Sequence, residues 1–403
     1  MSLNRRRSTL ALLALAISAF AIGTTEFISV GLLPLLSSDL NVPITTAGLT
    51  VSLYALGVTI GAPILTSLTS NIPRKTLLIW IMMIFIVGNS IAASATSIGV
   101  LLAARIISAF SHGVFMSIGS TIAADLVPEN RRASAISIMF SGLTVATVTG
   151  VPLGTFIGQH FGWRMAFVLI TIVGIIALIA NSTLIPSDLR AGTRTSIHDQ
   201  VKLLKNGRLL LVFAITALGY GGTFVVFTYL SPILQDIAGF KEGTVALILL
   251  IYGVAIAIGN MIGGKLSNQQ PLRALWVMFI VQAIVLVILY FTAPFKTAGL
   301  ITIFFMGLLA FMNVPGLQVY VVTLAKRFVP SAVDVASAMN IAAFNIGIAL
   351  GSYIGGLITD SIGMIHTTWI GALMVLAAVV LTRRSLTLEQ REQQRDIGGI
   401  VHE

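Results

Sequence analysis

Two charged side chains lie deep inside apolar stretches of the chain, where burying a charge is costly. Glu26 falls within the apolar run 9–36, and it is the only acidic residue well inside any such run. A charged side chain at the centre of a bilayer costs roughly 2.5–3.5 kcal/mol on insertion scales. Because burial favours the neutral carboxyl, Glu26 is suited to gaining and losing a proton inside a membrane. The alternative is a permanently neutral Glu26 that only hydrogen-bonds a neighbouring helix.

Arg105 is the second such residue, and we expect it at the depth of Glu26. Counted from the same end of the predicted helices, Glu26 lies about ten residues in and Arg105 about eight, or very roughly 12–15 Å. His112 lies seven residues after Arg105 on the same helix face, and imidazole titrates near neutral pH. The three residues form a candidate proton-coupling group. Two alternatives stay open: Arg105 bridges only backbone carbonyls, or His112 is a neutral packing residue.

Further polar side chains inside apolar runs are candidates for lining a substrate cavity. They are Tyr54, Tyr220, Thr223, Tyr229, Asn313, Gln318, Asn340 and Asn345. Taken singly, each is more often a hydrogen-bonding contact between helices than a ligand contact. Asn313 also precedes Pro315, which removes a backbone donor and should kink its helix.

The composition identifies a membrane protein and excludes several other classes. Of 403 residues, 56% are hydrophobic and 9% are charged, whereas soluble chains carry about 25% charge. The net charge of +10 forms no basic stripe with interleaved aromatics, so no nucleic-acid partner is expected. Cysteine is absent, which excludes disulfides and cysteine metal sites.

Motifs for covalent chemistry are also missing. The sequence contains no nucleophile elbow, no Walker loop and no cluster of metal ligands. We therefore expect no enzyme, no metal, no cofactor and no ATP-driven step. The intramembrane acid Glu26 suggests a proton gradient as the driving force instead.

Apolar runs of spanning length predict an all-α membrane protein with twelve transmembrane helices. The runs are 9–36, 44–70, 75–97, 98–126, 132–159, 163–186, 208–236, 242–268, 272–293, 297–326, 331–360 and 363–382. The polar connection 187–207 divides them into two sets of six and should carry a short surface helix. The predicted organisation is an N-terminal six-helix bundle 1–186, a cytoplasmic linker 187–207, and a C-terminal six-helix bundle 208–403 with a short cytoplasmic tail.

The two halves repeat, which predicts two pseudo-symmetric bundles. An offset of 198 residues aligns Gly23 with Gly221, and an offset of 201 aligns Gly162 with Gly363. Six helices per half give a parallel repeat about an axis along the membrane normal, and such transporters bind substrate between the halves. Glu26 aligns with Phe224, so the acid belongs to one half only.

The distribution of Lys and Arg predicts the orientation. With the N-terminus inside, twenty of the 24 Lys and Arg residues fall on the inner face and three on the outer face. We expect a multi-pass protein of a bacterial inner membrane, with both termini cytoplasmic.

Small residues recur at every fourth position of the fifth and eleventh helices, as helices in close contact require. The first stripe is Gly142, Ala146, Gly150, Gly154 and Gly158, with Pro152 beside it; the second is Ala343, Gly347, Gly351, Gly355 and Thr359. We expect both stripes to pack across the join between the halves, where alternating access would move them.

These motifs resemble the major facilitator superfamily over essentially the whole chain, and within it the twelve-helix drug/proton antiporters. Arg105-Ile-Ile-Ser-Ala is similar to the family's fourth-helix motif, whose Arg is implicated in proton coupling. Gly142 through Gly150-Val-Pro152-Leu-Gly154 resembles the fifth-helix antiporter motif. Thr24-Thr25-Glu26-Phe27, with Ser111-His112-Gly113, resembles the sugar-efflux group, including arabinose exporters.

One family motif is altered in this chain. The loop after the second helix normally contains an Asp, and Ser70 stands there, followed by Arg74 and Lys75. Asp125, at the inner end of the fourth helix, is expected to cap or pair with this basic loop instead.

The resemblance implies the major facilitator fold and a secondary transporter that exports small organic molecules, sugars or drug-like compounds, in exchange for protons. Its expected partners are a small-molecule substrate, protons and the lipid bilayer, and it is expected to be a monomer. The alternatives are an exporter of lipophilic cations (multidrug resistance), a nucleoside exporter, an uptake symporter or a non-transporting sensor. The fifth-helix motif disfavours the symporter, and the lack of a large extramembrane domain disfavours the sensor.

Overall fold

Apolar runs fold as helices here because a chain in lipid must satisfy its backbone hydrogen bonds internally. The computed structural model describes residues 5–69, 71–128, 132–187, 189, 197–267, 270–330 and 333–400. The helices of the first half are α1 (Arg5–Leu40), α2 (Ile44–Leu68), α3 (Arg74–Ala93), α4 (Ile98–Asp125), α5 (Arg132–Phe161) and α6 (Trp163–Leu184). Those of the second half are α8 (Gly207–Phe227), α9 (Leu230–Pro232), α10 (Glu242–Leu266), α11 (Pro271–Thr292), α12 (Lys296–Ala310), α13 (Val314–Phe328), α14 (Val333–Ser361) and α15 (Thr367–Ile400).

Twelve segments of the described chain are long and apolar enough to cross a membrane, as the sequence predicts. The tenth is broken between α12 and α13, and Pro315 lies in the first turn of α13, so the predicted kink is confirmed. The predicted single run 208–236 is wrong in detail, because α8 ends at Phe227 and a π-helical turn follows at Ile233–Ile237. Pro232 explains this break, since its ring would clash with the carbonyl four residues earlier.

The connection between the halves contains the expected short helix, α7 (Ile197–Lys205). Residues 188 and 190–196 of the predicted linker lie outside the described residues, as does Ser70. The predicted domain limits at 186 and 207 stay a prediction.

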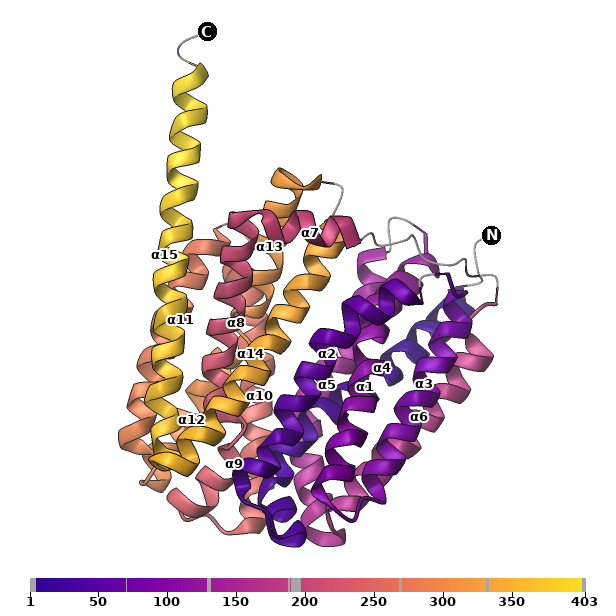
Figure 1. The fold of residues 1–403 in the computed structure, drawn as a ribbon, viewed down its shortest axis with the longest axis vertical. Helices are drawn as coiled ribbons and strands as arrows, with labels where there is room; N and C mark the ends of the chain where they lie inside the picture. Colours follow the sequence, from indigo (N-terminus) through magenta and orange to yellow (C-terminus); the bar gives the residue numbers. More distant parts are fainter. Residues whose placement is uncertain are drawn as a thin grey trace.

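The two halves form two helical bundles that lie side by side (Figure 1). Within the first, α1 packs on α5 and α6, and within the second α8 packs in the same way on α14 and α15. The bundles meet where α2 contacts α14 and where α5 contacts α10, two pairs that the repeat makes equivalent. Gly162 and Gly363, aligned by the repeat, both adopt the left-handed region with φ of 86° and 104°. A side chain is strained in that region, so glycine is required at both matching turns.

Both chain ends lie on one face of the molecule, which we call the terminal face, and the opposite face carries the turns around α9 (Figure 1). Several contacts between the bundles lie toward the opposite face. Gln159, near the end of α5, donates from Nε2 to the carbonyl oxygen of Glu242, at the start of α10, at 2.7 Å.

The glycine stripes do not pack across the join, so that expectation is wrong. Gly142 faces the Ala16 backbone and Gly150 faces Thr24, both on α1, in the same bundle as α5. Gly351 and Gly355 face the backbone of α8 at Gly221 and Val225. Small residues at every fourth position identify a helix face on which another helix can pack closely, but they do not identify that other helix. Other faces of α5 and α14 make the contacts between bundles.

Candidate functional site

Arg105 joins three helices at the centre of the first bundle. Its side chain is 1% exposed, and all of its hydrogen bonds go to backbone carbonyls. Nε donates to Thr50 of α2 at 3.0 Å, while Nη1 and Nη2 donate to Thr25 and Glu26 of α1 at 2.5 and 3.2 Å. The predicted shared depth of Glu26 and Arg105 is therefore confirmed. The contacts match the alternative in which Arg105 bridges backbone carbonyls.

Tyr54 connects Arg105 to His112. The Arg105 guanidinium carbon lies 4.1 Å from the centre of the Tyr54 ring, a cation–π contact. The Tyr54 hydroxyl lies 3.2 Å from His112 Nδ1, within hydrogen-bonding distance. Both side chains are buried. The structure thus brings three predicted site residues, from α2 and α4, into one connected group.

The Glu26 carboxylate lies beside this group without an ion-pair partner. Its side chain is 9% exposed, and no Lys or Arg nitrogen of the described residues lies within 4 Å of it. Arg105 acts on it electrostatically, and Glu26 in turn acts on Tyr54 and on Tyr220 of the second bundle. Glu26 is thus a buried acid close to both bundles.

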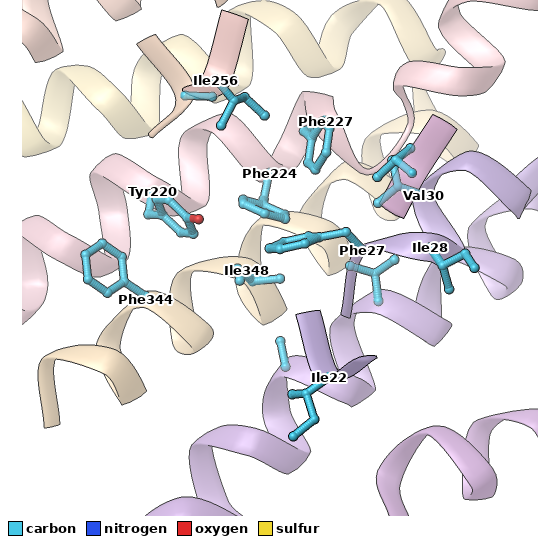
Figure 2. Close-up of a cluster of buried hydrophobic side chains, with 14 of the residues drawn as sticks. Ile22, Phe27, Ile28, Val30, Tyr220, Phe224, Phe227, Ile256, Phe344 and Ile348 are labelled. Atoms are coloured by element: carbon cyan, nitrogen blue, oxygen red, sulfur yellow. The ribbon is translucent and has the colours of Figure 1, made fainter. Parts of the chain in front are cut away.

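Aromatic side chains meet next to Glu26, at the boundary between the bundles (Figure 2). We call this group the inter-bundle aromatic cluster, and its members are Phe27, Tyr220, Phe224, Phe227, Tyr252, Phe311 and Phe344. Phe27 of α1 lies 6.4 Å from Phe224 and 6.0 Å from Phe311, measured between ring centres. Tyr220 lies 4.9 Å from Phe344. Rings at these distances pack against one another, so the cluster joins the two bundles beside Glu26.

Thr223 and Asn313 are joined by Gln282, a residue that the sequence reasoning did not select. Gln282 Nε2 donates to the hydroxyl of Thr223, and Asn313 Nδ2 donates to Gln282 Oε1 at 3.2 Å. The side-chain oxygen of Asn313, Oδ1, is buried without a hydrogen-bond partner among the described residues. The signal for Gln282 was present, since it is an amide inside the apolar run 272–293.

Gln318 and Asn340 form a second amide pair. Asn340 Nδ2 donates to Gln318 Oε1 at 2.9 Å, and Asn340 Oδ1 accepts from Thr216 Oγ1 at 2.8 Å. Gln318 Nε2 also donates to the Ser337 hydroxyl. These bonds join α8, α13 and α14, so the pair acts as a contact between helices in this structure.

Tyr229 and Asn345 do not join these groups. Tyr229 is fully buried at the break after α8 and donates to the Ser352 carbonyl at 3.2 Å. It fits against Gly48 of α2 and Gly356 of α14, beside a cavity of about 140 Å³. Asn345 Nδ2 donates to the Ile341 carbonyl of its own helix.

Asn89 is a second buried amide that the sequence reasoning did not select. It is 1% exposed on α3, and its Oδ1 accepts from the Thr25 hydroxyl at 3.1 Å. Because the Thr25 carbonyl accepts from Arg105, Asn89 helps to fix the part of α1 that carries Glu26. The signal was again an amide inside an apolar run.

The basic loop is held within the first bundle. Arg74 Nη1 donates to Asp125 Oδ2, as the sequence predicts. Lys75 Nζ donates to the Ser187 hydroxyl at 3.4 Å. Within the described residues, His, Asp and Glu side chains do not gather in threes as a metal site requires.

Comparison with known proteins identifies the family. A profile of the Major Facilitator Superfamily matches residues 15–333. The chain belongs to this superfamily. It is therefore a multi-pass membrane transporter and not an enzyme, and the resemblance drawn from the motifs is confirmed.

Relatives in this superfamily match almost the full length of the chain. The uncharacterized MFS-type transporter YtbD of Bacillus subtilis is 77% identical, over 95% of this chain and 97% of its own. The inner membrane transport protein YdhP of Escherichia coli K12 is 37% identical, covering 92% and 94%. The putative transporter AraJ of Escherichia coli K12 is 32% identical, covering 86% and 87%.

The fold also matches a solved structure. A bacterial homologue of the human lysosomal transporter Spinster, in an inward-facing and occupied conformation, superposes with a TM-score of 0.75. The match covers 95% of this chain and 98% of the other at 15% identity. The predicted major facilitator fold is therefore confirmed.

Proposed function

We propose that this transporter exports small organic molecules across an inner membrane in exchange for protons, with Glu26 as the proton-carrying carboxyl. The observation that carries the proposal is a buried acid for which the described residues provide no ion-pair partner, beside Arg105 and at the boundary between the bundles. An intramembrane acid of this kind is by default a functional residue.

Arg105 acts in this proposal as a fixed positive charge. Each of its three nitrogens donates to a backbone carbonyl of α1 or α2, so the guanidinium stays in position whether Glu26 is charged or neutral. The Coulomb attraction between the two groups depends on their separation and on the water around them. A change in bundle arrangement that alters either quantity makes Glu26 bind or release its proton.

The substrate binds, in this proposal, between Glu26 and the inter-bundle aromatic cluster. Uncharged polar contacts are available from Asn313, whose Oδ1 has no partner among the described residues. Aromatic rings favour flat, apolar or cationic compounds. The cluster therefore supports drug-like molecules over sugars as the exported class.

The relatives and the charge distribution support the proposed location. The name of YdhP describes an inner membrane transport protein, which supports the same membrane for this chain. The excess of Lys and Arg on the terminal face supports cytoplasmic termini. We also propose that the transporter works as a monomer.

The deciding experiment uses Glu26→Gln, which imitates the protonated carboxyl. In proteoliposomes with an imposed pH gradient, we expect the variant to lose uphill export while keeping equilibrium exchange, because exchange moves no proton. Glu242→Gln is the matched control, since Glu242 is exposed at the start of α10, and it should export as the parent does. Uphill export by Glu26→Gln at the parental rate contradicts the proposal.

A further inference from the structure

The described residues include a second cavity, of about 550 Å³, far from Glu26. It lies between the start of α8 and the part of α15 near the terminal face, two helices that pack side by side (Figure 1). Its lining combines Asn206, Gly207 and Arg208 from the start of α8 with Arg384 and Leu388 from α15. No step of the proposed transport uses this cavity.

Positive groups converge on the cavity. The Arg208 side chain is 11% exposed, and its Nη2 donates to the Tyr320 hydroxyl at 3.1 Å. Its Nε has no hydrogen-bond partner among the described residues. Arg384 is exposed. The N-terminus of α8 adds the partial positive charge of a helix end, although Asn206 Oδ1 already accepts from the backbone N–H groups of Arg208 and Leu209 at 3.0 and 3.2 Å.

Acidic neighbours neutralise part of this charge. Glu392 Oε1 lies 3.3 Å from Arg208 Nη1, but Glu392 is shared with Arg327 at 2.9 Å. Glu389 is half-buried and interacts electrostatically with Arg208, Glu392 and Arg327. Arg384 is the cavity-lining arginine for which the described residues provide no ion pair. The cavity therefore keeps a cation that can meet an anion.

An apolar surface continues from Arg384 toward the middle of the helix. Val380, Leu376 and Leu373 follow on the same face of α15, and they are 67%, 43% and 54% exposed. Leu210, which also lines the cavity on α8, is 43% exposed. In a membrane these side chains face acyl chains, and Arg384 lies at the end of the apolar segment, where lipid headgroups begin. The arrangement has the polarity of a phospholipid, with charge at one end and hydrocarbon along the rest.

We propose that this cavity binds the phosphate group of an anionic phospholipid, with the acyl chains along Val380, Leu376 and Leu373. Arg384 donates to the phosphate, and the Arg208 guanidinium and the positive end of the α8 dipole add electrostatic attraction from the wall of the cavity. The proposal does not depend on the transported substrate.

The test counts lipids on the purified protein by native mass spectrometry in mixtures of phosphatidylglycerol and phosphatidylcholine. We expect Arg384→Gln to weaken phosphatidylglycerol binding about five-fold, the effect of one cation near a membrane surface. Arg383→Gln is the matched control, because this neighbouring guanidinium lies over the Trp276 ring, 5.4 Å from its centre. It should bind phosphatidylglycerol within about two-fold of the parent, since each surface charge counts only where it meets the lipid.

A second measurement separates a bound lipid from a free anion. Phosphatidylglycerol should raise the unfolding temperature of the parent and of Arg383→Gln more than that of Arg384→Gln, whereas inorganic phosphate alone should raise none of them. Equal loss of lipid in both variants means a non-specific lipid annulus and overturns the proposal. Stabilisation by inorganic phosphate that depends on Arg384 also overturns it, because the site then binds free phosphate.

Discussion

Tyr54 is the residue that contacts both Arg105 and His112 in the candidate proton site. The Arg105 guanidinium lies over the Tyr54 ring, and the Tyr54 hydroxyl lies within hydrogen-bonding distance of His112. The two contacts use different atoms, so substitutions can remove them one at a time. A desolvated cation–π contact contributes about 2 kcal/mol, and a hydrogen bond about 1 kcal/mol net.

Tyr54→Phe keeps the ring and removes the hydroxyl, whereas Tyr54→Leu removes both. We expect the free energy of unfolding to fall by about 1 kcal/mol for Phe and by about 3 kcal/mol for Leu, from the loss of one or both contacts. Thermal unfolding of the purified variants in one detergent measures the order. Equal losses for Phe and Leu would mean that the ring contributes nothing to holding Arg105.

For individual residues of the site, the sequence predicts the depth in the membrane but not the hydrogen-bond partners. Counting residues along two apolar runs placed Glu26 and Arg105 at one level, and the hydrogen bond from Arg105 to the Glu26 carbonyl confirms it. The carbonyl partners themselves leave no mark in the sequence, because every residue has one. Whether Glu26, Arg105 and His112 couple proton movement stays a prediction.

Helix pairs in close contact determine the shape of each bundle. The stripe of α5 packs on α1 and the stripe of α14 packs on α8, so the repeat produces the same contact twice. Tightness differs from one position of a stripe to the next. A Cβ added at Gly150 would lie 3.3 Å from Thr24 Cα, whereas one added at Gly351 would overlap the carbonyl of Gly221.

Gly351→Ala should therefore destabilise the protein more than Gly150→Ala. Overpacking against a backbone that cannot move aside costs on the order of 1–3 kcal/mol, and the Thr24 contact requires a smaller shift. Gly99→Ala is the control, since nothing lies within 4 Å of a Cβ added there. Unfolding temperatures should follow the order Gly99→Ala, Gly150→Ala, Gly351→Ala from high to low. A Gly351→Ala variant as stable as the Gly99 control would mean that the two helices separate at little cost.

The helices themselves were predictable because lipid enforces them, whereas their partners were not. The lengths of the apolar runs predicted the twelve membrane-spanning segments, and Pro315 predicted the break in the tenth. Pro232 carried the same signal for the break after α8, and the reasoning did not use it. The partners of the glycine stripes were predicted wrongly, since spacing along one helix contains no information about the helix opposite.

At the scale of the whole molecule, the bundles touch through two equivalent pairs, α2 with α14 and α5 with α10. Tyr229 belongs to this contact, because it fits against Gly48 of the first bundle and Gly356 of the second. The inter-bundle aromatic cluster, with Phe27 of the first bundle against Phe224 of the second, lies between the same bundles (Figure 2). In the proposed transport, substrate reaches the opposite face when these contacts open, as alternating access between two repeats requires.

This opening can be tested by linking the bundles on the opposite face, since the chain contains no cysteine that would need to be removed first. Gln159→Cys combined with Glu242→Cys introduces one thiol in each bundle, at positions where side chain and backbone now meet at 2.7 Å. We expect a short bifunctional maleimide to stop transport by this double variant, because the link holds the two bundles together. Each single variant should keep transporting after the same treatment.

The matched control is a link on the same face within one bundle. Asp39 of α1 and Arg164 of α6 form an ion pair at 2.7 Å. Asp39 also accepts from Trp163 Nε1 and Arg164 also donates to the Ala95 carbonyl, so the cross-linked control is compared with its own untreated double variant. Cross-linked Asp39→Cys with Arg164→Cys should transport as well as the untreated double variant, since both thiols move with one bundle. If the link between Gln159→Cys and Glu242→Cys also leaves transport intact, the bundles do not separate at this face during the cycle. Loss of transport in that pair alone, together with intact transport in the control, identifies the contact between α5 and α10 as one that opens in every turnover.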